Sequence, residues 1–135
     1  MARVIIDTGV LVAGARGQLD GSALGDEDDV VLPAVVVAEY LAGVLLDHDA
    51  ARQAAQRAFL ADVLRVVPVS DYTQAVAEHH AELLAHVSRA GQPRGAHDLL
   101  IAATALATGR TLITTDAGAR FDQLPGISSR LVATS

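Results

Sequence analysis

The sequence has 135 residues, of which 51% are hydrophobic, and we expect one domain over residues 1–135 with one well-filled core. It contains no cysteine, which excludes disulfides and thiolate metal sites. All ten basic residues are arginine, so a Walker-loop lysine and a Schiff-base lysine are excluded as well. The net charge of −6 is unsuited to coating nucleic acid through non-specific attraction. No apolar run approaches the about 20 residues of a membrane span, and the N-terminus lacks a secretory-signal pattern, so we expect a cytoplasmic protein that does not enter a membrane.

The predicted elements alternate between strands and helices. A buried strand over residues 4–6 ends at Asp7 and is followed by a loop or short helix. After a solvated connection, an apolar helix is predicted to begin at Pro33 and to continue to about His48. A more polar helix over residues 50–63 and a strand over residues 64–70 come next.

The second half of the chain continues this alternation. Asp71 is predicted to cap a helix with an apolar stripe, and the Gln-Pro-Arg-Gly segment ends that helix. Residues 96–109 predict an almost wholly apolar, buried helix, and short strands are expected over residues 111–116 and 129–134. The alternation predicts an α/β fold of three layers with a mainly parallel sheet of roughly five strands.

Four carboxylates occupy unusual positions in this scheme. Asp7 and Asp116 lie at the C-terminal ends of predicted strands, at the sheet edge where open parallel sheets form their binding crevice. Asp98 lies in the first turn of the buried helix, and Glu39 lies on an apolar helix with small neighbours. Carboxylates gathered at one edge repel one another unless a cation lies between them, and hard oxygen ligands favour Mg²⁺ or Mn²⁺. This arrangement predicts metal-dependent hydrolysis of a nucleic-acid backbone.

Each residue also has a simpler structural explanation. Asp7 can stabilise the turn after its strand, Asp98 can stabilise a helix end, and Glu39 can pair with an arginine of a neighbouring helix. His97 adjoins Asp98 and is a candidate to orient it. Arg94 is the best candidate to contact a phosphate, with a surface salt bridge as the alternative.

Four motifs together resemble the PIN-domain ribonucleases, and more narrowly the VapC toxins of bacterial toxin–antitoxin pairs. They occur in the usual order and cover essentially the whole chain. The motifs are IIDTGVLVA (5–13), PAVVVAEYLAGV (33–44), HDLLIAATALATG (97–109) and LITTDAGARFDQLPGI (112–127).

The resemblance implies an acidic quartet of catalytic residues: Asp7, Glu39, Asp98 and Asp116. The expected metal ligands are Asp7, Asp98 and Asp116. Thr8 and Thr114 are nearby polar residues that would orient a ligand or a water. Many relatives carry a further acid before the phenylalanine of the last motif, where this chain has Arg120, and the part taken by Asp122, just after Phe121, is left open.

The resemblance further implies an endoribonuclease that leaves a 5′-phosphate and a 3′-hydroxyl. It implies a homodimer, neutralised by a cognate VapB-like antitoxin that also carries the pair to operator DNA. With few aromatic side chains available to stack on bases, recognition of RNA should depend on arginine, backbone amides and RNA shape.

The alternatives divide into other enzymes and a non-enzyme. A haloacid-dehalogenase-like phosphatase requires a second aspartate where this chain has Gly9, and both it and a receiver domain require a lysine. A PIN-like module that has lost catalysis and acts by binding a protein partner is not excluded by sequence.

Overall fold

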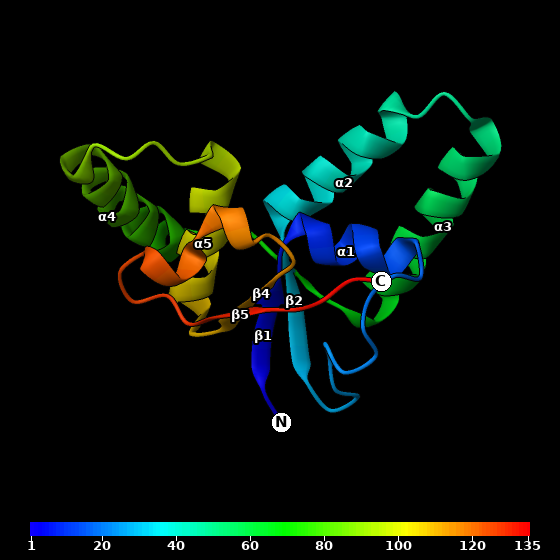
Figure 1. Cartoon of the computed structure of the whole chain (residues 1–135), viewed down its shortest axis with the longest axis horizontal. Helices are drawn as coiled ribbons and strands as arrows, with labels where there is room; N and C mark the ends of the chain where they lie inside the picture. Colours follow the sequence, from blue (N-terminus) through cyan, green and yellow to red (C-terminus); the bar gives the residue numbers. More distant parts are fainter.

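A five-stranded sheet forms the centre of the protein, for which a computed structural model describes residues 1–135 (Figure 1). All four strand pairings are parallel, and the spatial order is β3-β2-β1-β4-β5. The strands are β1 (Arg3–Ile6), β2 (Asp29–Pro33), β3 (Val69–Ser70), β4 (Thr111–Thr114) and β5 (Ser129–Leu131). This architecture confirms the expected α/β fold with a parallel sheet, and β5 is an edge strand as predicted.

The strand order reverses direction between β1 and β4. Ile5 pairs with Leu112 and Ile6 with Ile113, and the amide of Asp7 continues the ladder by donating to the carbonyl of Ile113 at 3.1 Å. In open parallel sheets, ligands bind outside the carboxyl ends of the strands at such a switch point. Asp7 therefore leaves the sheet where a binding site is expected.

Helices cover the sheet on two sides. They are α1 (Thr8–Ala15), α2 (Ala34–Leu46), α3 (Ala50–Val66), α4 (Gln74–Ala90) and α5 (Ala96–Thr108), with two short 3₁₀ turns, η1 (Ala117–Ala119) and η2 (Phe121–Gln123). In Figure 1, α1, α2 and α3 lie to the right of the strands, whereas α4 and α5 lie to the left. The protein therefore has the three layers predicted from the alternation of strands and helices.

The core lies between these layers. Twenty-three buried apolar residues form one cluster. The central strands contribute continuous apolar runs to it, because a parallel strand covered on both faces has no solvent-facing side. Helix α5 contributes Leu99, Ile101 and several alanines, and its C-terminus adopts the left-handed conformation at Gly109, which confirms the buried helix and its end.

Two predicted boundaries were wrong between residues 64 and 73. Residues 64–66 continue α3, and the strand that follows is only Val69–Ser70. A short apolar run fits a buried strand or the end of a helix equally well, so periodicity did not separate them. Helix α4 is capped by Thr73, whose hydroxyl accepts from the amide of Val76, and Asp71 lies outside it.

The segment before α2 also differs from the prediction. Residues 29–33 form β2, so the run predicted as a solvated connection ends at the strand, and Asp29 pairs with Arg110 at 3.0 Å. Pro33 ends this strand and is the N-cap of α2, one position before the helix that it was expected to begin. Helix α2 ends at Leu46.

None of the helices combines the length and the apolar character that a membrane crossing requires.

Candidate functional site

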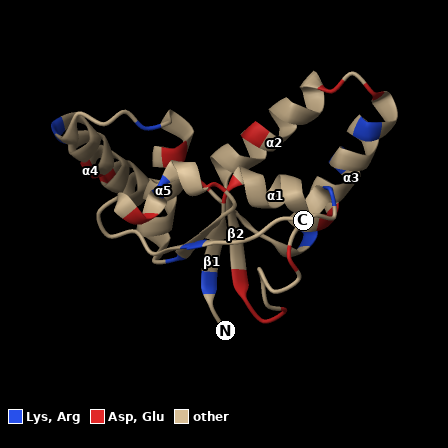
Figure 2. Cartoon of the chain, viewed as in Figure 1, with Lys and Arg blue, Asp and Glu red and all other residues tan.

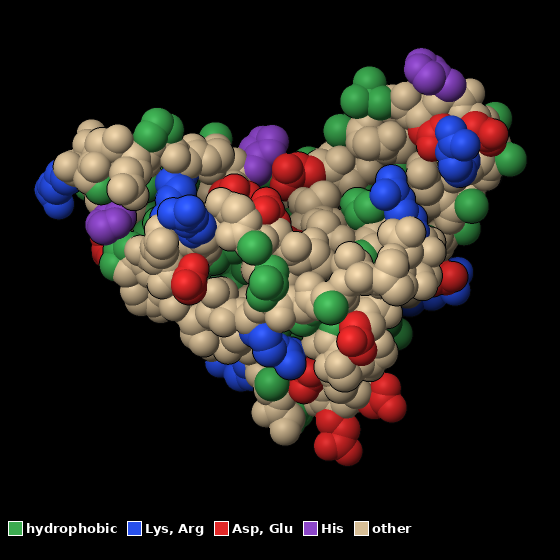
Figure 3. Space-filling view, in the orientation of Figure 1, with side chains coloured by type: hydrophobic (Ala, Val, Ile, Leu, Met, Phe, Trp, Pro, Cys, Tyr) green, Lys and Arg blue, Asp and Glu red, His purple; other side chains and the backbone are tan.

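The four acidic residues come from four segments that meet at one end of the sheet. Asp7 follows β1 and Asp116 follows β4 by two residues, while Asp98 lies in the first turn of α5 and Glu39 in α2. Acidic positions on α2, at the start of α5 and above the central strands face one another in Figure 2. Figure 3 shows a V-shaped hollow here, with acidic side chains on its floor. The structure thus brings the predicted quartet to one cleft.

Asp7 is held by two hydrogen bonds at the floor of this cleft. Its Oδ1 accepts from the amide of Val10 at 3.2 Å, which caps α1, and its Oδ2 accepts from the hydroxyl of Thr114. The residue is only 6% exposed. Burial raises the pKa of Asp7, the two hydrogen bonds oppose the rise, and the charges of Asp116 and Asp98 add to it. Asp7 is therefore a helix cap and also a buried acid that faces other acids.

Asp116 is linked to Asp7 through the same threonine. The amide of Asp116 donates to Oγ1 of Thr114 at 3.0 Å. Its Oδ1 accepts from the amides of Gly118 and Ala119 at 2.9 and 3.2 Å, which caps the η1 turn. These contacts engage one carboxylate oxygen and leave Oδ2 without a hydrogen bond in the protein.

Glu39 binds two polar side chains from other segments. Its Oε1 accepts from the hydroxyl of Thr8 at 2.8 Å, and its Oε2 lies 3.0 Å from Nδ1 of His97. An ion pair between Glu39 and an arginine, the structural alternative considered above, is not present. The structure therefore places Thr8 and His97 beside Glu39, and His97 contacts this acid although Asp98 is its chain neighbour.

Asp98 differs from the other acids because its carboxylate accepts no hydrogen bond in the protein. Burial raises its pKa, and the charges of Asp116 and Glu39 raise it further, while the charges of Arg94 and His97 lower it. Like charges in a partly buried cleft oppose folding unless a cation is present. Asp98 is therefore the acid whose carboxylate is most available to bind a cation.

The donor chemistry of the cleft fits a divalent cation, although the side chains do not converge on one point. No three histidine, aspartate or glutamate side chains lie close enough together to hold a metal ion. The free oxygens of Asp98 and Asp116 are hard ligands of the kind that Mg²⁺ and Mn²⁺ prefer. The carboxylates are close enough for the charge of one to shift the pKa of another. The residues thus match a metal site in type and location.

Arg94 joins the two segments that carry Asp98 and Asp116. Its guanidinium donates to the carbonyl oxygens of Ala119 and Arg120 at 2.5 and 2.9 Å. Arg94 lies in the loop before α5, so these bonds tie the start of that helix to the turn after Asp116. The surface salt bridge considered as an alternative for Arg94 is absent.

Residues after Asp116 form a second feature that sequence reasoning did not identify. Arg120 and Asp122 line a cavity that also contains Asp116. Arg120 has a left-handed backbone conformation, with φ of 50°, and no other residue except glycine has a positive φ. An arginine between an alanine and a phenylalanine gives no sequence signal for this conformation, which favours glycine, asparagine or aspartate.

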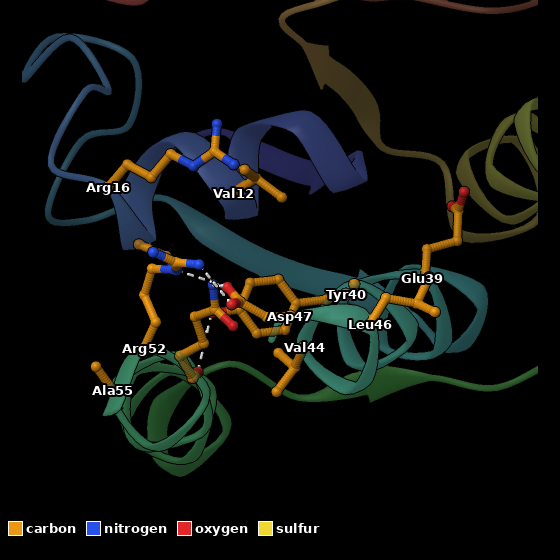
Figure 4. Close-up of a pocket in the computed structure, with 12 residues that line it drawn as sticks. Val12, Arg16, Glu39, Tyr40, Val44, Leu46, Asp47, Arg52 and Ala55 are labelled. Atoms are coloured by element: carbon orange, nitrogen blue, oxygen red, sulfur yellow. Dashed lines mark hydrogen bonds and ion pairs between the residues drawn. The ribbon is translucent and has the colours of Figure 1, made fainter. Parts of the chain in front are cut away.

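Another cavity, of about 410 Å³, lies between α1, α2 and α3 rather than among the acids. Glu39 is at one end of it, and Figure 4 shows the Glu39 side chain pointing away from the Arg52–Asp47 pair at the other end. Nη2 of Arg52 lies 2.7 Å from Oδ1 of Asp47, and the hydroxyl of Tyr40 donates to the carbonyl of Gln56 at 2.9 Å. These contacts join α2 to α3, so this end of the cavity is part of the scaffold.

Comparison with known proteins places this site in context. The family model described as PIN domain matches residues 4–127. No curated protein matches the chain.

Several solved structures share the fold. VapBC2 from Rickettsia felis, bound to a DNA fragment from its promoter, has a TM-score of 0.84 and 21% identity, over 96% of this chain and 98% of that chain. VapBC-5 from Mycobacterium tuberculosis, a member of the VapBC family of toxin–antitoxin systems, has a TM-score of 0.78 and 28% identity, over 98% and 99%. FitAcB from Neisseria gonorrhoeae has a TM-score of 0.79 and 26% identity, over 93% and 95%.

Proposed function

The chain belongs to the PIN-domain family, and we propose that it is a divalent-metal-dependent endoribonuclease and the toxin of a toxin–antitoxin pair. The observation that carries the proposal is the meeting of Asp7, Glu39, Asp98 and Asp116 at the switch point of the parallel sheet. The charges of Asp116 and Asp98 raise the pKa of Asp7, and the charges of Asp116 and Glu39 raise the pKa of Asp98. A cation would relieve this repulsion. Residues 1–135 act as a single catalytic domain in this proposal.

We assign the metal to Asp7, Asp98 and Asp116, with Mg²⁺ as the expected ion and Mn²⁺ as an alternative. A bound divalent cation supplies a Lewis acid that activates water and neutralises the charge developing on a phosphodiester. Asp98 and Asp116 offer oxygens without hydrogen bonds, whereas Asp7 offers a carboxylate that Thr114 and the amide of Val10 hold in one orientation.

The remaining polar residues position the acids or the substrate. Thr8 and His97 hold the carboxylate of Glu39, which faces the cleft as the fourth acid. A carboxylate in this position can accept a proton from a water molecule at the cleft. Arg94 fixes the loop before Asp98 against the turn after Asp116.

The substrate and partners follow from the resemblance and from the related complexes. RNA in the cytoplasm is the proposed substrate. Since the similar structure from M. tuberculosis is a member of the VapBC family of toxin–antitoxin systems, we propose a VapB-like antitoxin that covers the acidic cleft. A basic side chain of that antitoxin would be attracted to the carboxylates. We further propose that the protein is a homodimer. It should reach operator DNA only through the antitoxin, because a chain with a net charge of −6 is repelled by the DNA phosphates.

Cleavage of RNA by the purified, antitoxin-free protein tests this proposal. Total RNA is incubated with Mg²⁺, with Mn²⁺ or with EDTA, and the product ends are mapped. Asp98→Asn should abolish cutting, whereas the matched control Asp71→Asn, at an exposed acid outside the cleft, should cut like the wild type. Discrete metal-dependent cuts with 5′-phosphate ends are expected. Cutting that survives in Asp98→Asn would refute the assignment of the acids.

One observation favours a second candidate, a PIN-like module that has lost catalysis and only binds a protein partner. No three potential ligands lie close enough to hold a metal in this structure. The two functions separate in a calorimetric titration with Mn²⁺. An enzyme of the proposed kind binds the ion through Asp98 and cuts RNA, whereas the binding module does neither and still binds its antitoxin.

A further inference from the structure

A cavity of about 330 Å³ lies beside Asp116, at the carboxyl ends of β4 and β5. Thr114 and Asp116 belong both to this cavity and to the acidic cleft. A molecule that fills the cavity is therefore adjacent to the acids. The residues that line it are Thr114, Asp116, Ala117, Arg120, Phe121, Asp122, Ser129 and Leu131.

The lining combines apolar surface with a small number of polar groups. Phe121 is buried, at 2% exposure, whereas Leu131 is 58% exposed. Ser129 and Asp122 add a hydroxyl and a carboxylate. Binding sites for small polar ligands typically join an apolar surface to a few polar groups that set orientation.

Arg120 supplies the one cation of this cavity. It forms no ion pair within the protein, and its neighbour Asp122 does not engage it. The unpaired guanidinium of Arg120 can attract an anion, whereas the neighbouring Asp116 and Asp122 repel it. Its planar donors suit a phosphate in particular.

The backbone of Arg120 is held in an unfavourable conformation by its surroundings. Its φ of 50° is left-handed, a conformation that is unfavourable for a residue with a Cβ. Arg94 donates to its carbonyl oxygen, and Asp116 caps the turn that precedes it. Backbone strain of this kind persists where the surrounding structure enforces it, and such positions cluster at ligand sites.

We propose that this cavity binds one nucleotide of the RNA strand, next to the bond that is cut at the acidic cleft, and that Arg120 contacts its phosphate. The inference rests on the proposed function, because the cavity has this use only if RNA crosses the cleft. It adds a substrate subsite and a binding residue to the four acids. Asp122 and Ser129 are then placed to contact the base or ribose of the same nucleotide.

Binding of a mixed-sequence, single-stranded RNA oligonucleotide to the Asp98→Asn protein measures the contact without cleavage. Arg120→Gln should weaken binding by about tenfold, the effect of losing a charged hydrogen bond. The slope of log affinity against log salt concentration should fall by about 0.7, because one phosphate contact is removed from a single strand. Arg3→Gln changes the net charge equally at the opposite end of β1 and should leave affinity and slope unchanged.

Arg120→Gly distinguishes a lost contact from a damaged fold. Glycine adopts the left-handed conformation at no steric cost, so this variant should melt at or above the temperature of the parent protein while its RNA affinity falls as in Arg120→Gln. Arg120→Lys, which keeps the charge, should retain more affinity than either.

The outcomes separate this proposal from the proposed function. Unchanged affinity and slope in Arg120→Gln and Arg120→Gly, with RNA still bound, would overturn the subsite and leave the nuclease assignment standing. Loss of antitoxin binding alone, with RNA binding intact, would assign the cavity to the protein partner and overturn it as well. If the wild-type protein neither binds nor cuts RNA, the proposed function fails and the subsite fails with it.

Discussion

The hydroxyl of Thr114 donates a hydrogen bond to Asp7 across 107 residues of sequence. The same oxygen accepts from the amide of Asp116 at 3.0 Å, so one buried side chain connects two of the four acids. It also continues the pairing of β1 with β4 beyond the last paired residues of the ladder. The orientation of Asp7 thus depends on a residue of a neighbouring strand.

Replacing Thr114 with valine should destabilise the protein and impair the site. Valine keeps the shape of threonine but leaves the buried Asp7 oxygen and the Asp116 amide without their partner, at a cost of about 1–3 kcal/mol. The pKa of Asp7, already raised by burial, should rise further because this hydrogen bond lowers it. Urea unfolding measures the loss, and Thr114→Ser, which keeps the hydroxyl, should lie close to the wild type.

Asp98→Asn should stabilise the metal-free protein at neutral pH. Burial, and then the charges of Asp116 and Glu39, raise the folded-state pKa of Asp98 above its unfolded value. Wild-type stability therefore falls as pH rises through the interval between the two values, whereas the asparagine variant lacks this contribution. The gain should not exceed about 1 kcal/mol, because solvent screens partly exposed charges.

Melting curves in EDTA at several pH values test this expectation. The two proteins should converge in acid, below both pKa values, where Asp98 is protonated in the folded and unfolded states alike. Added Mg²⁺ or Mn²⁺ should raise the melting temperature of the wild type more than that of the variant. A variant less stable than the wild type at every pH would contradict the repulsion inferred here.

Arg94 should act by positioning the acids rather than by binding RNA. Arg94→Ala removes the two hydrogen bonds that tie the loop before Asp98 to the turn after Asp116. Misplacement of reacting groups lowers turnover, so kcat should fall by about 10- to 100-fold while KM for RNA changes little. Arg94→Lys, which retains donors, should recover part of this kcat. A raised KM with unchanged kcat would instead support the phosphate contact expected from sequence.

The ion pair between Arg52 and Asp47, which joins α2 to α3, should make a contribution to stability whose pH dependence is opposite to that of Asp98. The Arg52 side chain, together with the amide of Asp49, holds the pKa of Asp47 well below its usual range. This contribution to stability is present above the unfolded pKa and is lost as pH falls through the folded value. Asp47→Asn should therefore lower the urea midpoint at neutral pH, with a difference that shrinks in acid. Asp71→Asn is the matched control and should behave like the wild type at both pH values.

The sequence was sufficient to predict which elements carry the acids, because local patterns decide those elements. The apolar run before Asp7 and the long apolar helix that contains Asp98 have one reasonable interpretation each. The apolar run over residues 64–67 is compatible with either a strand or a helix end, and in the structure residues 64–66 are the end of α3. A parallel sheet then brings the ends of β1 and β4 together by topology alone.

The contacts between these elements could not be predicted. Arg94 donates to the carbonyl oxygen of Ala119, 25 residues away. Every residue has a backbone carbonyl, so the residue types do not indicate which one Arg94 contacts. The left-handed backbone of Arg120 is likewise enforced by its surroundings, against its own preference. The sequence therefore predicts the four acids that meet in the cleft, whereas the groups that orient them depend on tertiary structure.

The strand order has a consequence for the point in synthesis at which the four acids can meet. The central strand β1 is made first, but its partner β4 and the acid that follows it are among the last segments to be synthesised. An incomplete nascent chain, or a fragment cut before residue 111, has an open edge on β1 and lacks one of the four carboxylates. Under the proposed function, the nuclease activity should therefore arise only when the chain is nearly complete, so that the proposed antitoxin has the time of synthesis in which to accumulate.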